Sequence, residues 1–269
     1  MISEVALSFL TLYPWNLGVS GYFTLGDYST DRSYQSKQVV ASLDRRGKDV
    51  LLLNYENLDI KDDIGSFTQE NIIFRNVLWF RPELRLGSIA GLVQSNSIDK
   101  GWMVGGQSEG DLPWLGYSLD YTYSEFRGWE PQPVVWNIID YPITQLGFGV
   151  SKKLNLLIVR MHVVKQRVDG NDYFLFSGKI TCDIWKDLSF ALHGSMGESR
   201  YALDPYILVM ENNPDILKQS YGIYASYQIT PNISISGEAL RKEYSPAFDL
   251  RWYTKYHIRY FVFGIQLRL

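Results

Sequence analysis

The hydrophobic pattern along the chain repeats every second residue. Residues 115–126, LGYSLDYTYSEF, show it most clearly. The odd positions from 115 to 123 are leucine or tyrosine, and the even positions from 116 to 124 are small or polar. This alternation predicts a β-strand with one apolar side. Such a side faces a protein core in a soluble sandwich but lipid in an outer-membrane barrel, so other features must distinguish the two.

Fourteen segments alternate in this way and predict an all-β protein. They are residues 17–27, 36–45, 48–59, 67–80, 84–95, 101–109, 115–126, 141–151, 154–168, 172–185, 188–199, 217–229, 232–244 and 254–269. No segment approaches the roughly 18 to 20 uninterrupted apolar residues of a membrane-spanning helix. An even number of strands is typical of bacterial single-chain barrels. Segment 3–13 also alternates and is interpreted as a lead-in, with sixteen strands as the alternative.

The connections between these segments fall into two groups. Those at 14–16, 45–48, 81–83, 111–114, 152–153, 186–187 and 230–231 are tight, whereas those at 28–35, 60–66, 96–100, 127–140, 169–171, 200–216 and 245–253 are mostly longer. Outer-membrane barrels have short periplasmic turns and long extracellular loops. The sequence therefore predicts a single transmembrane antiparallel up-and-down β-barrel over residues 16–269, preceded by a lead-in over residues 1–15, in the bacterial outer membrane.

Aromatic residues and the final strand support the same prediction. Trp15, Trp79, Trp114 and Trp185 lie beside tight turns, where a periplasmic aromatic girdle is expected. The last strand alternates up to Leu269 and is similar to the terminal strand that the outer-membrane assembly machinery recognises. Outer-membrane lipid and that machinery are therefore the expected partners.

Charge and cysteine content exclude several other classes. The net charge of −3 gives no basic surface for nucleic acid. The single cysteine, Cys182, excludes an internal disulfide.

The first residues, MISEVALSFLTLYPWN, lack the charged region and cleavage site of a signal peptide. We interpret this start either as following a removed leader or as part of a longer polypeptide.

Polar positions opposite the apolar faces are predicted to line the lumen. The candidates are Asp44, Glu56, Arg85, Asp120, Arg160, His162, Lys179, Asp183, His193, Ser195, Glu238 and Arg268. They carry both signs of charge, which is typical of a water-accessible barrel interior. Three scattered histidines predict no metal site, and no cofactor is expected.

One motif resembles a hydrolase site. His193, Ser195, Gly197 and Ser199 reproduce the H-x-S-x-G-x-S spacing of outer-membrane phospholipase A, in which a histidine activates a serine. The downstream Ser-Trp-Asn element of that family is absent from residues 200–230. The alternation also directs His193 and Ser195 into the lumen, away from lipid. We interpret them as a hydrogen-bonded lumenal pair and do not expect an enzyme.

Two stretches carry a resemblance to a known family. These are GYFTLGDYST, residues 21–30, and YGIYASYQITPNISISGEALRKEYS, residues 221–245. With the order and lengths of the strands, they resemble the YaiO-like outer-membrane β-barrel family. The resemblance implies a single barrel linked to helical repeats or exopolysaccharide machinery, and it transfers no catalytic residue.

The leading functional prediction is a porin-like channel or export component of a Gram-negative outer membrane. Polysaccharide is the expected cargo, from the resemblance and from Tyr22 and Tyr224 on the lumenal face. The alternative is a non-conducting scaffold that docks periplasmic or other outer-membrane proteins, and a lipid hydrolase ranks last. Loops 127–140 and 200–216 are long enough to fold inward. Residues 205–216, PYILVMENNPDI, are expected to be a plug or a docking surface.

Overall fold

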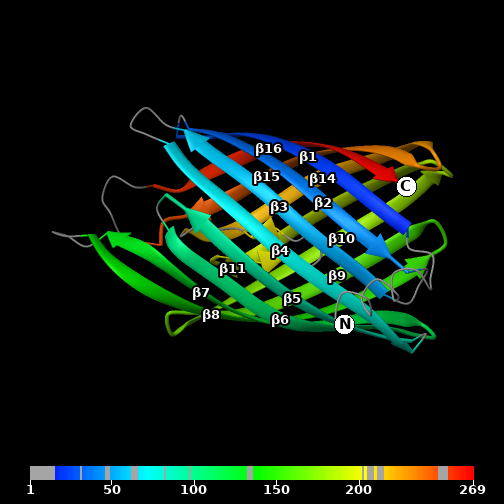
Figure 1. The fold of residues 1–269 in the computed structure, drawn as a ribbon, viewed down its shortest axis with the longest axis horizontal. Coiled ribbons are helices and arrows are strands. Elements are labelled where there is room, and N and C mark those ends of the chain that lie inside the picture. The colour runs from blue at the N-terminus through cyan, green and yellow to red at the C-terminus, as the bar shows by residue number, and fades with distance from the viewer. Residues whose placement is uncertain are drawn as a thin grey trace, which may run out of the picture.

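The chain forms one closed antiparallel barrel of fourteen strands (Figure 1). The computed structural model describes residues 16–30, 32–45, 49–61, 66–81, 83–96, 98–131, 136–201, 203–204, 209–210, 215–247 and 254–269. The wall consists of β1 (Asn16–Tyr28), β2 (Ser33–Asp44), β3 (Asp49–Lys61), β4 (Ser66–Arg81), β5 (Leu84–Ser95), β6 (Ile98–Leu112), β7 (Leu115–Pro131), β8 (Trp136–Leu154), β9 (Leu157–Val168), β10 (Asn171–Trp185), β11 (Leu188–Ser199), β14 (Ile216–Thr230), β15 (Ile233–Ser245) and β16 (Tyr256–Arg268). The described residues include no helix that is long and apolar enough to cross a membrane.

Each wall strand pairs with its neighbours in sequence, and β1 pairs with β16 to close the barrel. The backbone N–H of Leu269 donates to the carbonyl of Leu17 at 2.8 Å and extends this seam beyond the last strand. Closure leaves no exposed sheet edge, so every wall strand has two hydrogen-bonded neighbours. The predicted fourteen-stranded up-and-down barrel is confirmed. The predicted lead-in strand, residues 3–13, lies outside the described residues.

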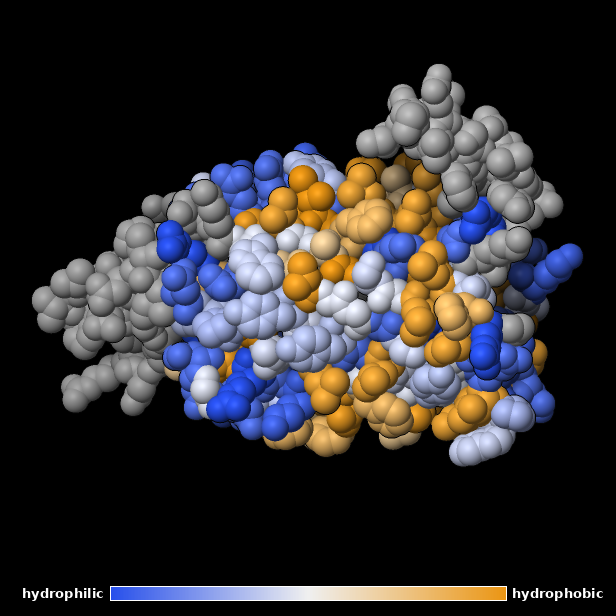
Figure 2. Space-filling view, turned by 60° about the horizontal axis from the view of Figure 1, so that its bottom comes forward, coloured by the Kyte–Doolittle hydropathy of each residue, from blue (hydrophilic) through white to orange (hydrophobic). Residues whose placement is uncertain are grey.

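The two faces of β7 show which side of the wall meets lipid. Leu119 and Tyr121 are 47% and 50% exposed on the outside, whereas Asp120 and Thr122 are 2% and 4% exposed on the inside. The same alternation runs round the wall, and apolar side chains cover much of its outer surface (Figure 2). A belt of exposed apolar residues on a closed barrel is stable only in contact with lipid. The apolar side of LGYSLDYTYSEF therefore faces the membrane.

A charge placed in this belt is expected to destabilise the barrel strongly. Leu192, in the middle of β11, is 58% exposed on the outer face. Leu192→Arg should lower the unfolding free energy by about 2 to 4 kcal/mol, because the charge would be buried near the bilayer centre. Urea unfolding in phospholipid vesicles, followed by tryptophan fluorescence, measures this. Leu188→Arg, beside the turn on the same face, is the matched control and should cost at most about 1 kcal/mol.

Most two-residue turns of the described residues lie at one end of the barrel, whereas the turn at 169–170 lies at the other. Two-residue turns at 113–114, 155–156, 186–187 and 231–232 lie at the end that holds the C-terminus (Figure 1). The tight turn expected at 152–153 occurs three residues later because β8 continues to Leu154.

The expected long loop over residues 127–140 is largely strand. β7 continues to Pro131 and β8 begins at Trp136, with these two residues in register. Alternation does not reveal this extension, because strand ends that project beyond the bilayer have water on both faces and need no apolar side.

Candidate functional site

The inner wall carries an apolar patch in the long-loop half of the lumen. Residues from seven consecutive strands, β4 to β10, form one buried cluster: Ile73, Ile89, Val93, Met103, Phe126, Tyr141, Ile143, Val168 and Tyr173. Tyr201 belongs to the same cluster but comes from the segment between β11 and β14. At Tyr201 the chain therefore returns into the barrel and packs against its inner face.

Tyr201 and Arg200 anchor the returning segment, whose described residues, 200–201, 203–204 and 209–210, we call the plug. The Tyr201 ring lies 5.8 Å from that of Phe126 and 5.7 Å from that of Tyr141. The guanidinium of Arg200 lies over the rings of Tyr141 and Tyr201, at 5.7 and 5.1 Å from their centroids. The backbone N–H of Arg200 donates to Gln166 Oε1 at 2.7 Å. Both anchors are nearly buried, at 7% and 8% exposure for Arg200 and Tyr201.

Burial also fixes the ionisation state of the plug anchor. It raises the pKa of the Tyr201 hydroxyl well above its usual value, since the phenolate would lose its solvation. The hydroxyl therefore stays protonated at pH values at which an exposed tyrosine ionises. Beyond Tyr201 the plug forms a short sheet of β12 (Leu203–Asp204) and β13 (Val209–Met210), drawn in yellow between the walls in Figure 1.

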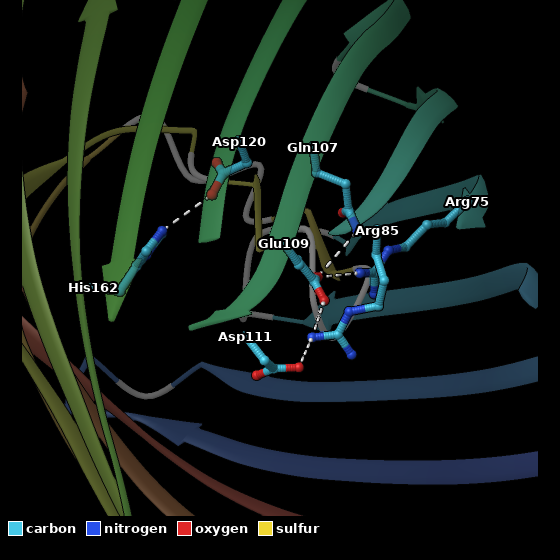
Figure 3. A network of polar contacts seen from close by, with 7 residues as sticks. All are labelled: Arg75, Arg85, Gln107, Glu109, Asp111, Asp120 and His162. Atoms are coloured by element: carbon cyan, nitrogen blue, oxygen red, sulfur yellow. Dashed lines mark hydrogen bonds and ion pairs between the residues drawn. The ribbon is translucent and has the colours of Figure 1, made fainter. Parts of the chain in front are cut away.

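The short-turn half of the lumen is polar and contains an ion-pair network (Figure 3). Glu109 Oε1 accepts from Arg75 Nη2 at 2.9 Å and from Gln107 Nε2 at 3.2 Å. Arg85 Nη2 lies 3.7 Å from Glu109 Oε2 and 3.5 Å from Asp111 Oδ2. The network thus joins β4, β5 and β6 on one wall. Its two arginines compensate two carboxylates.

Two histidine–carboxylate pairs each span an intervening strand. His162 Nε2 on β9 lies 3.1 Å from Asp120 Oδ1 on β7, across Gly147 of β8. A Cβ at Gly147 would lie 2.4 Å from Asp120 Oδ1, so only glycine leaves room for this contact. His193 on β11 similarly lies over Gly222 of β14 and reaches Glu238 Oε1 on β15 at 3.0 Å.

Glu56 accepts hydrogen bonds within a buried polar cluster on the inner wall. Ser36 Oγ donates to Glu56 Oε1 at 2.6 Å, and Asn71 Nδ2 donates to Oε2 at 3.1 Å. Gln69 Nε2 in turn donates to Asn71 Oδ1 at 2.9 Å. The cluster ties β2, β3 and β4 together inside the wall. Its hydrogen bonds compensate the buried carboxylate of Glu56, which is only 4% exposed.

The serine of the hydrolase-like motif bonds to another serine. Ser195 Oγ lies 2.7 Å from Ser220 Oγ, while His193 contacts Glu238 instead. Both side chains belong to the inner face of β11. The arrangement ties β11 to β14 and β15 and offers no serine–histidine pair toward lipid.

The remaining predicted positions lie along the inner wall. Asp44 shares the inward parity of Ser36 on β2, and Asp183 accepts from Ser189 Oγ at 2.7 Å. Lys179 Nζ lies 5.2 Å from the Tyr224 ring centroid. Arg268 borders a cavity of about 220 Å³ at the short-turn end. Within the described part of the chain, no group of three potential ligands could hold a metal ion.

The tryptophans expected in the girdle occupy different places. Trp114 and Trp185 are 66% and 70% exposed. Trp79 instead lies on the inner face of β4, with the Arg85 guanidinium 5.8 Å from its ring. Its parity with buried Ile73 and Val77 directs it inward, although it is close to a turn. Trp15 lies outside the described residues.

Arg75, Gln107 and Glu109 were not among the sequence candidates, although they form the centre of the network in Figure 3. Like Arg85, they occupy the lumen-facing alternate positions of β4, β5 and β6, and this alternation could have identified them from the sequence. Tyr201 and Arg200 carried no such signal, because a loop residue has no strand parity from which to infer its direction.

The fold and the lumen define the class of this protein: it is an outer-membrane β-barrel. The sequence matches no family profile and no curated relative. The structure is similar to the CymD monoaromatic hydrocarbon channel, with a TM-score of 0.62 and 8% identity over 97% of this chain and 90% of that chain.

Other solved barrels are similar at the same low identity. The toluene transporter TodX of Pseudomonas putida has a TM-score of 0.53 and 9% identity, covering 96% of this chain and 90% of that one. Omp33, an outer membrane protein of Acinetobacter baumannii, has a TM-score of 0.50 and 9% identity, covering 96% and 98%. These likenesses define the fold.

Proposed function

We propose that this protein is an outer-membrane channel whose lumen is closed at rest by the plug and conducts when the plug leaves the inner wall. The observation that carries the proposal is the docking of Tyr201 and Arg200 against the inner wall. These contacts are noncovalent, so the plug can be released without breaking the barrel. The fourteen wall strands hydrogen-bond independently of it.

The interior supports conduction of a polar solute. The short-turn half carries Lys179, Arg160 and Glu238, and it contains the open cavity. CymD and TodX are described as a channel and a transporter, which favours a related role for a barrel of similar fold. The YaiO-like resemblance adds exopolysaccharide as the cargo to be tested first, with the lumenal rings of Tyr22 and Tyr224 as stacking surfaces for sugars.

A non-conducting scaffold is the second candidate. The observation that favours it is the density of ion pairs within the lumen, together with a plug packed on apolar wall residues. In a scaffold these features would close the lumen permanently. The two functions therefore differ in whether plug movement produces current.

A reversible lock on the plug tests the proposal. Cys182 is the only cysteine of the chain, so Cys182→Ser gives a thiol-free background. Phe126→Cys and Tyr201→Cys then place thiols at positions whose rings are 5.8 Å apart, within reach of a short reducible bis-thiosulfonate linker. In planar bilayers we expect more frequent openings than in the wild type before linking, because the stacked rings that dock the plug are gone. Linking should abolish these openings, and reduction should restore them.

The single-cysteine variants are the controls and should be unaffected by the linker. Absence of current from a verified folded barrel, both before linking and after reduction, would favour the scaffold. Openings that persist in the linked protein would show that the plug does not gate the lumen.

A further inference from the structure

Three adjacent strands present a row of basic side chains on the inner wall. Lys179 of β10 is in register with Arg160 of β9 on one side and with His193 of β11 on the other. Directly opposed residues on one face have their Cβ atoms about 5 Å apart. Like charges so placed repel each other and destabilise the pairing. The wall therefore keeps Arg160 and Lys179 side by side at an energetic cost.

These two cations differ from the paired basic groups of the inner wall. Arg75 and Arg85 pair with Glu109 and Asp111, and His193 pairs with Glu238. Among the described residues, no carboxylate lies within ion-pair distance of Arg160 or Lys179. Arg160 is exposed to the lumen, and the Lys179 ammonium lies over the Tyr224 ring.

The nearby carboxylates have other partners. Asp183, four residues along β10 on the same face, accepts from Ser189. Asp120 contacts His162, two residues from Arg160 on β9. Glu238 contacts His193 at the end of the row. Arg160 and Lys179 thus leave an adjacent pair of positive charges toward lumenal water.

Hydroxyl and amide groups continue the surface from this row to the short-turn mouth. Tyr224, beneath Lys179, also borders the 220 Å³ cavity. Tyr22, Ser226, Ser236, Gln266 and Arg268 line the same cavity. A solute held by its anionic group at the row would therefore have hydrogen-bonding neighbours for its hydroxyl groups.

We infer that Arg160 and Lys179 form a lumenal oxyanion site, which binds the phosphate or carboxylate group of a hydroxyl-rich solute. A guanidinium offers paired donors to an oxyanion, and an adjacent ammonium adds a second charge. Basic side chains in a pore select for anions. The inference deepens the proposed channel function by naming an anionic cargo, and the binding site itself can be tested without conduction.

Phosphorus NMR on the whole folded barrel in a phosphate-free detergent measures binding directly. Inorganic phosphate is the probe, and exchange with the protein should broaden its signal. Arg160→Gln/Lys179→Gln should weaken binding by roughly fivefold or more for each charge removed. Lys37→Gln/Arg259→Gln removes two exposed cations from the outer face and is the matched control, with broadening expected to persist.

Two results would overturn the site: no broadening by the wild-type protein, or equal broadening by the wild type and the Arg160/Lys179 variant. Bilayer reversal potentials in a KCl gradient provide a separate measurement. We expect chloride preference in the wild type and its loss in the Arg160/Lys179 variant only. A silent barrel that still binds phosphate refutes the channel and leaves the site, whereas a conducting barrel indifferent to phosphate and to the variant refutes the site.

Discussion

Arg200→Ala/Tyr201→Ala is expected to raise the open probability of the channel by about a hundredfold. The substitutions remove a buried aromatic ring, worth about 2 kcal/mol, and a stacked cation, worth about 1 kcal/mol, from the docked plug. Each 1.4 kcal/mol changes an equilibrium constant by about tenfold. Single-channel recording before and after substitution measures the change.

The barrel itself should remain folded in this variant. Its heat-modifiable migration in gel electrophoresis should match the wild type, because the wall strands do not depend on Arg200 or Tyr201 for their hydrogen bonds. Phe174→Ala, which removes an exposed outer-face ring, is the control and should leave conductance unchanged. An open probability equal to that of the wild type in the folded variant would contradict gating by the plug.

Glu109→Ala is expected to lower the unfolding free energy by roughly 2 to 3 kcal/mol. The side chain is 16% exposed and neutralises Arg75, which is 10% exposed, so its loss leaves a largely buried charge without this carboxylate. The expected cost lies between those for exposed and fully buried ion pairs. Urea unfolding in phospholipid vesicles gives the value.

Two variants calibrate this measurement. Glu109→Gln keeps an acceptor for Arg75 and Gln107 and should cost less than the alanine variant. Asp172→Ala breaks an outer ion pair with Lys165, whose two partners are 43% and 48% exposed, and should change stability by at most about 1 kcal/mol. A Glu109→Ala effect no larger than that of Asp172→Ala would show that water already solvates the network.

Alternation alone predicted the wall because each strand separates lipid from lumen. In β7, the parity of Leu119 and Asp120 follows from the two solvents on its sides. The signal ends where the solvents become alike, which is why the extension of β7 to Pro131 was not predicted. Trp79 shows a second limit, because closeness to a turn does not determine which face a residue occupies.

The contacts between strands were less predictable than the strands. Gly147 and Gly222 occupy inward positions, and their role depends on which side chain crosses each of them. To predict the crossing side chain, one needs the register between β7, β8 and β9, or between β11, β14 and β15. No single strand encodes this register. The plug was anticipated as a possible inward fold of residues 200–216. Its anchors emerged only from the contacts of Arg200 and Tyr201 with the wall.

Gly197 determines where the plug segment leaves the wall. Its φ of +127° is a conformation that residues with side chains rarely adopt, and a Cβ there would lie 2.2 Å from the Phe174 carbonyl oxygen. The β11–β14 register shifts at this point, between Met196 and Ser199. The wall thus fixes the point at which the segment leaves it, and the pairing of the wall strands does not involve the residues beyond. In evolutionary terms, the segment between β11 and β14 could therefore change, and the gating with it, without any change in the strands that span the membrane.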